Sequence, residues 1–170
     1  AVEAIASPRE QAARLLVTAC QKGALVERLP VELQPANVDD GFAIQQEVSR
    51  QLGRRTGAWK CALPQPGKVI AAPIYDADIH RGLACRMRGS PRGSVRAEPE
   101  LACLLDRDLP PRREAYGEAE VLDALGDTHV ALELLGSRYA HPEELTFPEL
   151  LADGLFNAGL VLGPRVRLLD

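Results

Sequence analysis

Three glutamates occupy positions where a carboxylate could do chemistry. Glu98 and Glu100 stand two residues apart in SVRAEPELACLLDRD, and Glu133 is the one carboxylate within the aliphatic run HVALELL. Side chains along a strand alternate between its two faces, so a strand here places Glu98 and Glu100 on one face with Ala102. Both faces turn apolar within two residues, and we therefore expect these acids at the edge of a core.

Carboxylates in such a place need a partner. Two like charges about 7 Å apart along a strand face repel each other, and a lone buried carboxylate costs several kcal/mol. Glu133 shares a predicted strand face with Ala131 and with His129, whose ring could support a ligand. If the two strands are neighbours, Glu98 and Glu100 converge with Glu133. Carboxylate oxygens are the ligands that Mg²⁺ or Mn²⁺ prefers, so a metal site is one interpretation.

Other interpretations of these acids stay open. Glu-x-Glu is common on solvated strand faces, and Pro99 between the two acids favours an edge strand. Glu133 could instead pair with a buried arginine, for which Arg138 and Arg96 are the candidates.

A lysine offers a second candidate for chemistry. Lys60 in GAWKCAL lies between Trp59 and Cys61, with Leu63 close behind. A lysine desolvated by such neighbours, or set near a cation, can act as a base or proton shuttle. The alternative is a surface lysine whose stem covers apolar atoms while its ammonium stays in water.

The first third of the chain is expected to be helical. Apolar residues at helical spacing predict a helix over residues 8–22, with Ser7 as its N-cap and Gly23 beyond its end. The stretch NVDDGFAIQQEVSRQLG, residues 37–53, predicts a second helix that Gly53 ends.

Beyond Gly57 the sequence has short segments separated by proline and glycine. AWKCAL, VIAAPIY and GLACRMRG are typical of the strands and loops of a β-rich core, and THVALELLG predicts a further strand. Helices are expected to return in YGEAEVLDALG and in PEELTFPELLADGLF. We therefore expect an α+β fold with a helical N-terminal region, residues 1–57, and a β-rich core, residues 58–170.

Composition excludes several classes of function. The chain has 170 residues, 46% of them hydrophobic, which suffices for one sizeable core. A net charge of -4 with 4% aromatic residues disfavours nucleic-acid binding. No apolar run approaches the roughly 18 residues of a membrane helix, and the N-terminus lacks a signal-peptide core, so we expect a soluble, cytoplasmic protein. The four cysteines form no C-x-x-C pair, which favours reduced thiols.

The order of these motifs resembles the 2-keto-4-pentenoate hydratase branch of the fumarylacetoacetate hydrolase superfamily, which also includes oxalocrotonate decarboxylases. From about residue 35 onward the chain carries, in order, DDGFAIQ, a strand with Trp-Lys, the Glu-x-Glu strand, ALELLGSR and DGLFNAGLVLG. The resemblance implies that Glu98, Glu100 and Glu133 bind the metal and that Lys60 is the active-site lysine. It further implies a mixed β-sandwich roll behind a helical N-terminal part, assembled into homo-oligomers.

The resemblance also implies a chemistry. Mg²⁺ (or Mn²⁺) would bind a 2-oxo acid through its carboxylate and keto oxygens and stabilise the enolate formed from it. Lys60 would move the proton, and a water next to the metal would attack the conjugated enone. We thus expect a hydro-lyase of a catabolic route that acts on an unsaturated 2-oxo acid. Decarboxylation, C–C hydrolysis and a metal-binding paralogue without catalysis are the alternatives.

The chain departs from the family pattern at several places. KCALP, residues 60–64, stands where the family has Lys-Ile-Gly-Leu-Thr, which removes a permissive glycine and a hydroxyl. The following loop lacks the aspartate that partners the lysine, and Asp76 or Asp78 is the candidate replacement. Gly136 stands where many relatives have aspartate. Relatives continue beyond the GLVLG strand, so the core is expected to be incomplete at its C-terminal side relative to the family.

Overall fold

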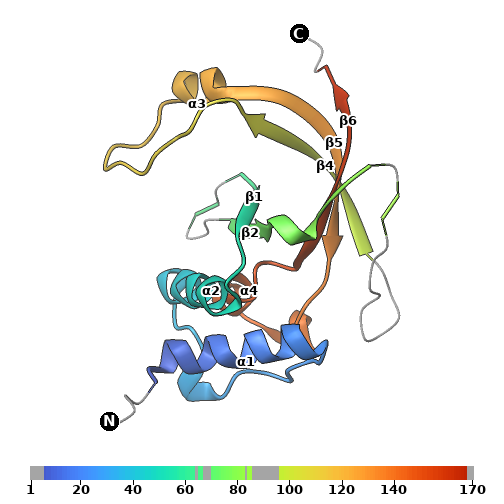
Figure 1. The fold of residues 1–170 in the computed structure, drawn as a ribbon. Helices are drawn as coiled ribbons and strands as arrows, with labels where there is room; N and C mark the ends of the chain where they lie inside the picture. The colour runs from blue at the N-terminus through green and yellow to red at the C-terminus, as the bar shows by residue number, and fades with distance from the viewer. Residues whose placement is uncertain (1–5, 64, 67–69, 83, 86–95, 168–170) are drawn as a thin grey trace.

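The computed structural model describes residues 6–63, 65–66, 70–82, 84–85 and 96–167. It combines helices with β-strands, and the strands begin after the first two α-helices (Figure 1). Its helices are α1 Pro8–Lys22, α2 Val38–Leu52, α3 Glu118–Ala124 and α4 Phe147–Ala152. Its strands are β1 Thr56–Cys61, β2 Ala71–Tyr75, β3 Ile79–Arg81, β4 Arg96–Leu105, β5 Leu125–Leu135 and β6 Asn157–Val166. Short 3-10 helices are η1 Val31–Leu33, η2 Asp76–Asp78 and η3 Pro142–Glu144. The predicted α+β class is confirmed, whereas the sandwich roll stays a prediction.

The first two helices begin and end where the sequence predicts. The Ser7 hydroxyl accepts a hydrogen bond from the backbone N–H of Glu10, and the Glu10 carboxylate accepts one from the N–H of Ser7. This reciprocal capping box satisfies two N–H groups that a helix start leaves free. Gly23 and Gly53 end α1 and α2 with φ of 62° and 61°, a left-handed conformation that glycine adopts without steric cost.

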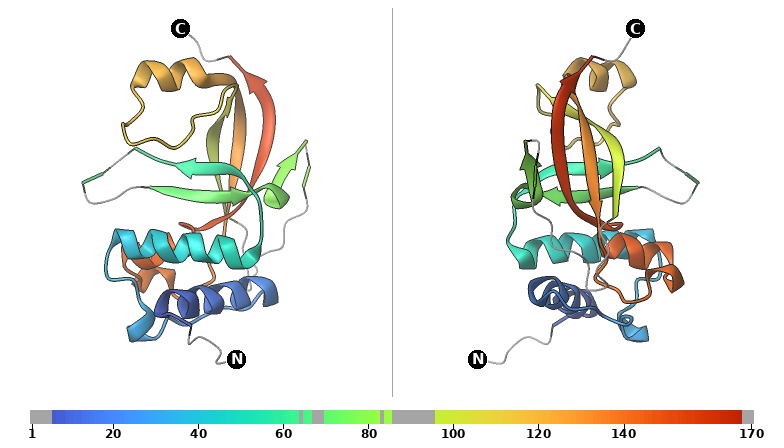
Figure 2. Two further views of the ribbon diagram at one scale, coloured as in Figure 1. Left: turned by 60° about the vertical axis from the view of Figure 1, so that its left-hand side comes forward. Right: turned by 90° about the vertical axis from the view of Figure 1, so that its right-hand side faces the viewer.

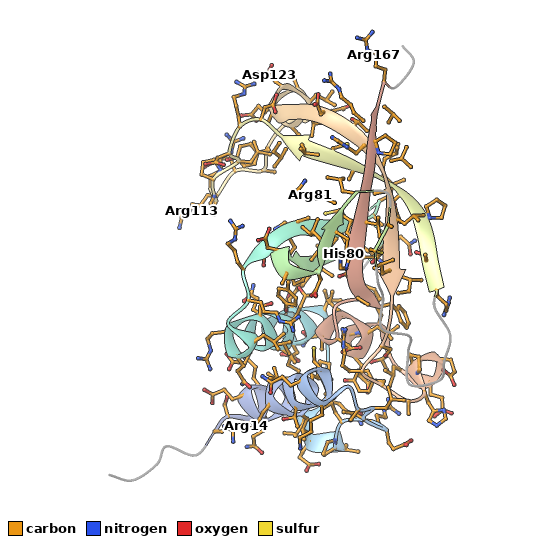
Figure 3. All side chains as sticks on the ribbon, turned by 45° about the vertical axis from the view of Figure 1, so that its right-hand side comes forward. Arg14, His80, Arg81, Arg113, Asp123 and Arg167 are labelled. Carbon is orange, nitrogen blue, oxygen red and sulfur yellow. The ribbon has the colours of Figure 1, made fainter. Side chains whose placement is uncertain are left out.

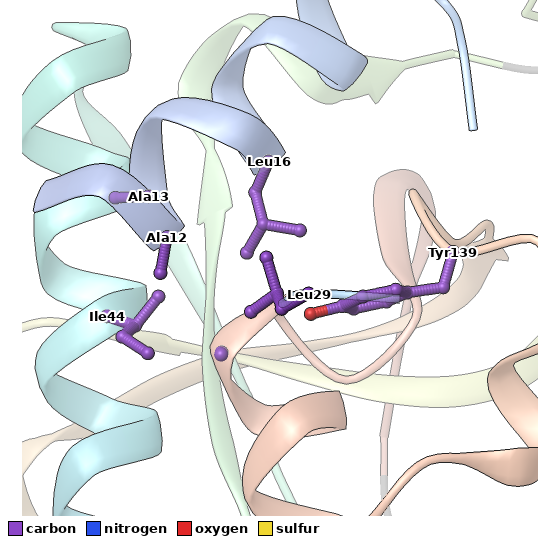
Figure 4. Packing of buried hydrophobic residues seen from close by; sticks show 7 residues of the cluster. Ala12, Ala13, Leu16, Leu29, Ile44 and Tyr139 are labelled. Carbon is purple, nitrogen blue, oxygen red and sulfur yellow. The ribbon is translucent and has the colours of Figure 1, made fainter. Parts of the chain in front are cut away.

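Both helices contribute to one apolar cluster that joins them to the rest of the protein. Figure 4 shows the Tyr139 ring beside Leu29, with Leu16 above them. The buried members are Ala12, Ala13, Leu16, Leu29, Ile44, Tyr139 and Ala152. The cluster joins residues on either side of the predicted boundary between residues 57 and 58, and the division into two regions stays a prediction. None of the described helices combines the length and the apolar character needed to span a membrane.

The strands form two sheets. β1 and β2 make an antiparallel pair, and the other four strands form a sheet in the order β3-β6-β5-β4, in which β3 is parallel to β6 and the other neighbours are antiparallel. In both views of Figure 2 the β1–β2 pair lies across this sheet, between the helical end and α3. Figure 3 marks the two ends of the molecule, Arg14 on α1 and Arg167 just beyond β6.

An apolar contact fixes how β1 faces the larger sheet. Ile74 of β2, Ala131 of β5 and Leu160 of β6 form a buried cluster, against which Ala58 of β1 and Ala102 of β4 pack. Residues two apart on a strand share a face. The β1 face that carries Ala58 is therefore turned toward the sheet face that carries Ala131.

The edge position of β4 corrects one expectation. Glu98 and Glu100 are exposed, and only Glu133 is buried, with 2% of its surface accessible. β4 has a neighbour on one side only, and on its other face Leu101 and Leu105 are exposed as well. The expectation that Glu98 and Glu100 are sheltered from bulk water at the edge of a core is thus wrong for the described part of the chain, while the edge strand that Pro99 favours is found.

The helix expected in PEELTFPELLADGLF is found as α4, which is shorter than the segment and is preceded by the separate 3-10 helix η3. Thr146 is the N-cap of α4. Pro148 stands in the first turn of α4, where its missing N–H leaves no hydrogen bond unmade, whereas inside a longer helix it would remove one. After α4, Leu155 and Phe156 have positive φ values of 52° and 66°.

Two smaller differences concern strand boundaries. The helix predicted in YGEAEVLDALG is found as α3, but it ends at Ala124, and Leu125, which lies within the predicted segment, is the first residue of β5. The short strand β3 has no counterpart in the predicted elements. Of the segment GLACRMRG, residues 83 and 86–89 lie outside the described residues.

Candidate metal centre

Three carboxylates from two neighbouring strands meet on one sheet face. Glu98 lies directly across from Glu133 in the β4–β5 ladder, and Glu100 follows on the same face of β4. Each offers one oxygen, and these three oxygens lie within 4.8 Å of one another. The convergence predicted from strand alternation is therefore found, and the binding of a metal by these residues stays a prediction.

Register explains why these side chains meet. Directly opposed residues of an antiparallel pair have Cβ atoms about 5 Å apart, and a shift of one residue would turn Glu133 to the other face. The pairing of Glu98 with Glu133, of Glu100 with Ala131 and of Ala102 with His129 keeps all six residues on one face. Because Ala131 is buried in the cluster with Ile74 of β2 and Ala102 packs against that cluster, this contact holds the register that brings the acids together.

Lys60 contacts the buried member of the acid cluster. Its Nζ lies 2.8 Å from Oε2 of Glu133 and donates a hydrogen bond to the Leu155 carbonyl at 3.2 Å. The lysine side chain is 19% exposed, so the ion pair is largely removed from water. The surface-lysine alternative is therefore wrong.

The burial of Lys60 has a different origin from the one expected. Trp59 and Leu63 are 59% and 86% exposed, and they do not enclose the lysine. Lys60 instead shares a strand face with Ala58, which packs against the larger sheet. The side chain is covered because β1 crosses the face of β5 that carries Glu133.

The arginine alternatives for Glu133 are wrong in this structure. The Nε of Arg138 lies 2.5 Å from Oδ1 of Asp153, and Arg96 is exposed at the start of the edge strand. Supporting contact from His129 is not found either, since its Nδ1 bonds to the carbonyl of Gly163 at 2.9 Å.

The two aspartates considered as partners of Lys60 are engaged elsewhere. Asp76 forms an ion pair with Arg55 at 2.8 Å, and Asp78 forms one with Arg54 at 3.0 Å. Within the described residues, the acid that contacts Lys60 is one of the three clustered glutamates, not a separate aspartate.

One contact could not be expected from the sequence. Asn157, the first residue of β6, donates a hydrogen bond from Nδ2 to Oε1 of Glu133 at 2.9 Å. Glu133 thus has Lys60 on one oxygen and Asn157 on the other. The only signal in the sequence is the position of Asn157 in the motif DGLFNAGLVLG, which does not reveal its partner.

The charges of this cluster favour a cation. Among the described residues, the ammonium of Lys60 is the one positive charge that forms an ion pair with the three carboxylates, which leaves an excess of negative charge. Like charges this close repel one another unless a cation lies among them. Glu98 and Glu100 are exposed, so their oxygens are accessible to an ion and its waters. A set of hard oxygen donors with open access fits Mg²⁺ or Mn²⁺.

A second group of possible metal ligands lies around η3, outside the glutamate cluster. His141, Glu143 and Glu144 offer atoms within 4.8 Å of one another around η3. The His141 ring also lies 3.6 Å from a carboxylate oxygen of Glu27. These side chains are on the surface and lack a buried donor comparable to Glu133, so the glutamate cluster is the stronger candidate.

No family model matches the chain, but curated relatives do. This chain is 32% identical over 165 residues to the 2-keto-4-pentenoate hydratase of Paraburkholderia xenovorans (strain LB400). Its identity to the 2-keto-4-pentenoate hydratase 3 of Pseudomonas putida is the same over the same length. Each match covers 91% of this chain and 60% of the relative. The chain thus spans less than two thirds of the length of these relatives.

Solved structures share the fold. The 4-oxalocrotonate decarboxylase from Pseudomonas putida G7, complexed with magnesium and adipate, matches with a TM-score of 0.67 at 15% identity over 91% of this chain and 63% of that one. The same enzyme complexed with calcium and acetate matches with a TM-score of 0.64, covering 62% of its chain.

Proposed function

Because this chain belongs to the fumarylacetoacetate hydrolase superfamily, with 2-keto-4-pentenoate hydratases as relatives, we propose that it acts in the metal-dependent hydration of an unsaturated 2-oxo acid. The observation that carries this proposal is the convergence of Glu98, Glu100 and Glu133 beside the ammonium of Lys60. The substrate class is a 2-oxo acid of the 2-keto-4-pentenoate type.

The three glutamates are the proposed ligands of a divalent cation. Glu133 is held by two hydrogen-bonding partners, while Glu98 and Glu100 lie at an exposed edge. Metal ligands are most effective when their orientation is fixed in advance by such partners. When bound, Mg²⁺ or Mn²⁺ supplies a Lewis acid for the carboxylate and keto oxygens of a 2-oxo acid. A magnesium ion and a dicarboxylate in the crystallised decarboxylase of the same fold support this choice.

Lys60 is the proposed proton shuttle. An ammonium has three hydrogens, and Lys60 uses two of its donors on Glu133 and Leu155. The third is available to a substrate at the cluster, where Lys60 can orient a carboxylate or move a proton at the substrate carbon next to the keto group. Its largely buried position keeps competing water away from that proton.

Decarboxylation of a 2-oxo acid is the second candidate. Its support is the likeness to 4-oxalocrotonate decarboxylase, whose chain has the same fold. The two reactions differ in their products, because hydration adds one water to the substrate whereas decarboxylation releases carbon dioxide. A cytoplasmic location and a homo-oligomeric assembly also remain part of the proposal.

Product analysis distinguishes these activities. Protein loaded with Mg²⁺ or Mn²⁺ is incubated with 2-keto-4-pentenoate and, separately, with 4-oxalocrotonate, and products are identified by mass spectrometry. We expect a product heavier by one water from the first compound, lost on adding EDTA and in Glu133→Gln. Glu32→Gln, which changes an exposed glutamate on η1, is the matched control and should keep activity. Release of carbon dioxide alone would replace hydration by decarboxylation, and metal-loaded, folded protein without either reaction would contradict catalysis.

A further inference from the structure

A strained turn lies directly before β6. Leu155 and Phe156 have φ of 52° and 66°, and they follow Gly154 with φ of 77°. Residues with a side chain rarely adopt this left-handed region, because Cβ then approaches the backbone too closely. Two such residues in succession persist only where the surrounding structure holds them, and strain of this kind is concentrated at functional sites.

One arginine bonds to both ends of this turn. The guanidinium of Arg138 contacts the carboxylate and the carbonyl of Asp153, and it donates to the Asn157 carbonyl at 3.1 Å. The Asp153 carboxylate also accepts from the N–H of Arg138 at 3.0 Å and from the Ser137 hydroxyl at 3.2 Å. Burial opposes the charge on Arg138, but Asp153 outweighs this effect and raises the pKa of the guanidinium. Burial also raises the pKa of the Asp153 carboxyl, and Arg138 offsets this only in part, so the evidence that the pair holds the turn is the set of hydrogen bonds from Arg138 to Asp153 and Asn157.

The turn supplies both contacts that hold the buried ion pair of the metal centre. The Leu155 carbonyl accepts from Nζ of Lys60 at 3.2 Å, and Nδ2 of Asn157 donates to Oε1 of Glu133 at 2.9 Å. A helical continuation of α4 through these residues would turn the Leu155 carbonyl along the helix axis and away from the lysine. The left-handed conformation is thus coupled to the geometry of the site.

Asn157 suits this task because its amide is neutral. Each oxygen of a carboxylate accepts about two hydrogen bonds or ligand contacts, so a donor on Oε1 fixes the plane of Glu133 and leaves room for a cation. A lysine or arginine in the same place would add a second positive charge and compete with the metal. The amide orients the carboxylate without that competition.

We propose that Asn157 is the positioning residue for the Glu133 carboxylate, and that the Arg138–Asp153 pair holds it in place through the strained turn. Arg138 and Asp153 lie outside the cluster of glutamates and act through Asn157 and Leu155. This inference rests on the proposed function, since it assigns roles at the same metal site.

Binding of Mn²⁺ tests the inference without any substrate. Affinity is measured by calorimetric titration with MnCl₂, and the environment of the bound ion is followed by its electron paramagnetic resonance spectrum. Loss of a partner that orients a metal ligand typically weakens metal binding about 10- to 100-fold. We expect Asn157→Ala to lower Mn²⁺ affinity by about tenfold or more and to broaden the spectrum, with Arg138→Lys showing a smaller loss in the same direction because lysine lacks the forked donors of arginine.

The variant Asn37→Ala shows whether weaker Mn²⁺ binding results from lost positioning of Glu133 or from lower stability of the whole fold. Asn37 caps α2 by accepting from the N–H of Asp40 at 2.9 Å, so its loss lowers stability at a place away from the glutamates. This variant should keep wild-type Mn²⁺ affinity and spectrum. If Asn157→Ala does not fold, Asn157→Ser, which keeps a shorter donor, is expected to show the same loss of affinity.

The outcomes distinguish the two proposals. If wild-type protein binds Mn²⁺ and folded Asn157→Ala or Asn157→Ser binds it equally well with an unchanged spectrum, the positioning role is wrong while the metal site stands. If Asn37→Ala weakens binding as much as the Asn157 variants, the effect is one of stability and the positioning role is likewise wrong. If folded wild-type protein binds no Mn²⁺, the proposed function itself fails.

Discussion

At the scale of single residues, the structure explains why an aliphatic run contains a glutamate. Glu133 is buried, and an unpaired carboxylate there would cost several kcal/mol. Lys60 and Asn157 each contact one of its oxygens, so the charge of Glu133 is compensated and each oxygen has a hydrogen-bonding partner. The two partners come from strands distant in sequence, and the run of residues around Glu133 could not reveal them.

Replacing Lys60 should show that the buried Glu133 carboxylate depends on a positively charged partner. Lys60→Met leaves Glu133 charged and buried, and we expect the free energy of unfolding to fall by about 2–4 kcal/mol at pH 7. Added Mg²⁺ should recover part of the loss, because a divalent cation replaces the missing charge. Urea unfolding with and without Mg²⁺ measures both effects.

A double variant is the control for that experiment. Lys60→Met combined with Glu133→Gln removes both charges, so it should be more stable than Lys60→Met alone and should not respond to Mg²⁺. A Lys60→Met protein within about 0.5 kcal/mol of wild type would show that the ion pair contributes little, as exposed pairs do.

At the scale of elements, locally determined features were predictable and the site's supports were not. The caps of α1 and α2 lie within a few residues of the helices they end, so residue types alone located both boundaries. Strand period placed Glu98 and Glu100 on one strand face, and the pairing of β4 with β5, on which their convergence with Glu133 depends, is found in the structure. Pro99 indicated the edge position of β4, which accounts for the exposure of that strand, whereas the turn at Leu155 is held by a distant arginine and has no signal in the local pattern.

Helix α4 gives a prediction of pH dependence. Burial works to raise the pKa of Glu149, but hydrogen bonds from Arg28 and then from Thr146 outweigh it and lower the pKa below its ordinary value. A carboxyl whose folded-state pKa is lowered stabilises the protein above its unfolded-state pKa, and this contribution disappears as pH falls through the folded-state value. Stability from Glu149 is therefore present at pH 7 and lost below about pH 4.

Glu149→Gln tests this contribution. We expect it to lower the free energy of unfolding by about 1–3 kcal/mol at pH 7, since Arg28 loses its partner and the cap of α4 is weakened. The difference from wild type should shrink toward pH 3 in thermal or urea unfolding. A difference that stays constant from pH 7 to pH 3 would mean that the ionisation of Glu149 does not stabilise the fold.

At the scale of the whole molecule, the site depends on the complete arrangement of sheets. Its side chains come from β1, β4, β5 and the start of β6, and the crossing of β1 over the sheet brings Lys60 to Glu133. The resemblance proposed Lys60 and the three glutamates as site residues from motif order, but spacing in sequence could not predict this crossing of β1 over the sheet. Nor could it show that Asp76 and Asp78 would be bound by arginines.

The prediction of a homo-oligomer also concerns the whole molecule. On the sheet face opposite the glutamates, Leu101 lies across from Val130 and Pro99 from Leu132, and the three aliphatic side chains are at least 40% exposed. Adjacent exposed apolar side chains favour self-association. We expect sedimentation velocity to show an assembly larger than the 18.4 kDa monomer, and Leu101→Glu to shift it toward the monomer. A wild-type protein that sediments as a monomer at micromolar concentration would contradict this prediction.

Calorimetric titration of metal-free protein with Mg²⁺ or Mn²⁺, followed by oxalate as a mimic of a chelating 2-oxo acid, addresses the metal site itself. We predict that the wild type binds the metal, that oxalate binds only after the metal, and that both signals are lost in Glu133→Gln and kept in Glu32→Gln. Folded wild-type protein that binds neither ion would contradict a metal site at Glu98, Glu100 and Glu133, and Glu133 would then be the ion-pair partner of Lys60 and no more.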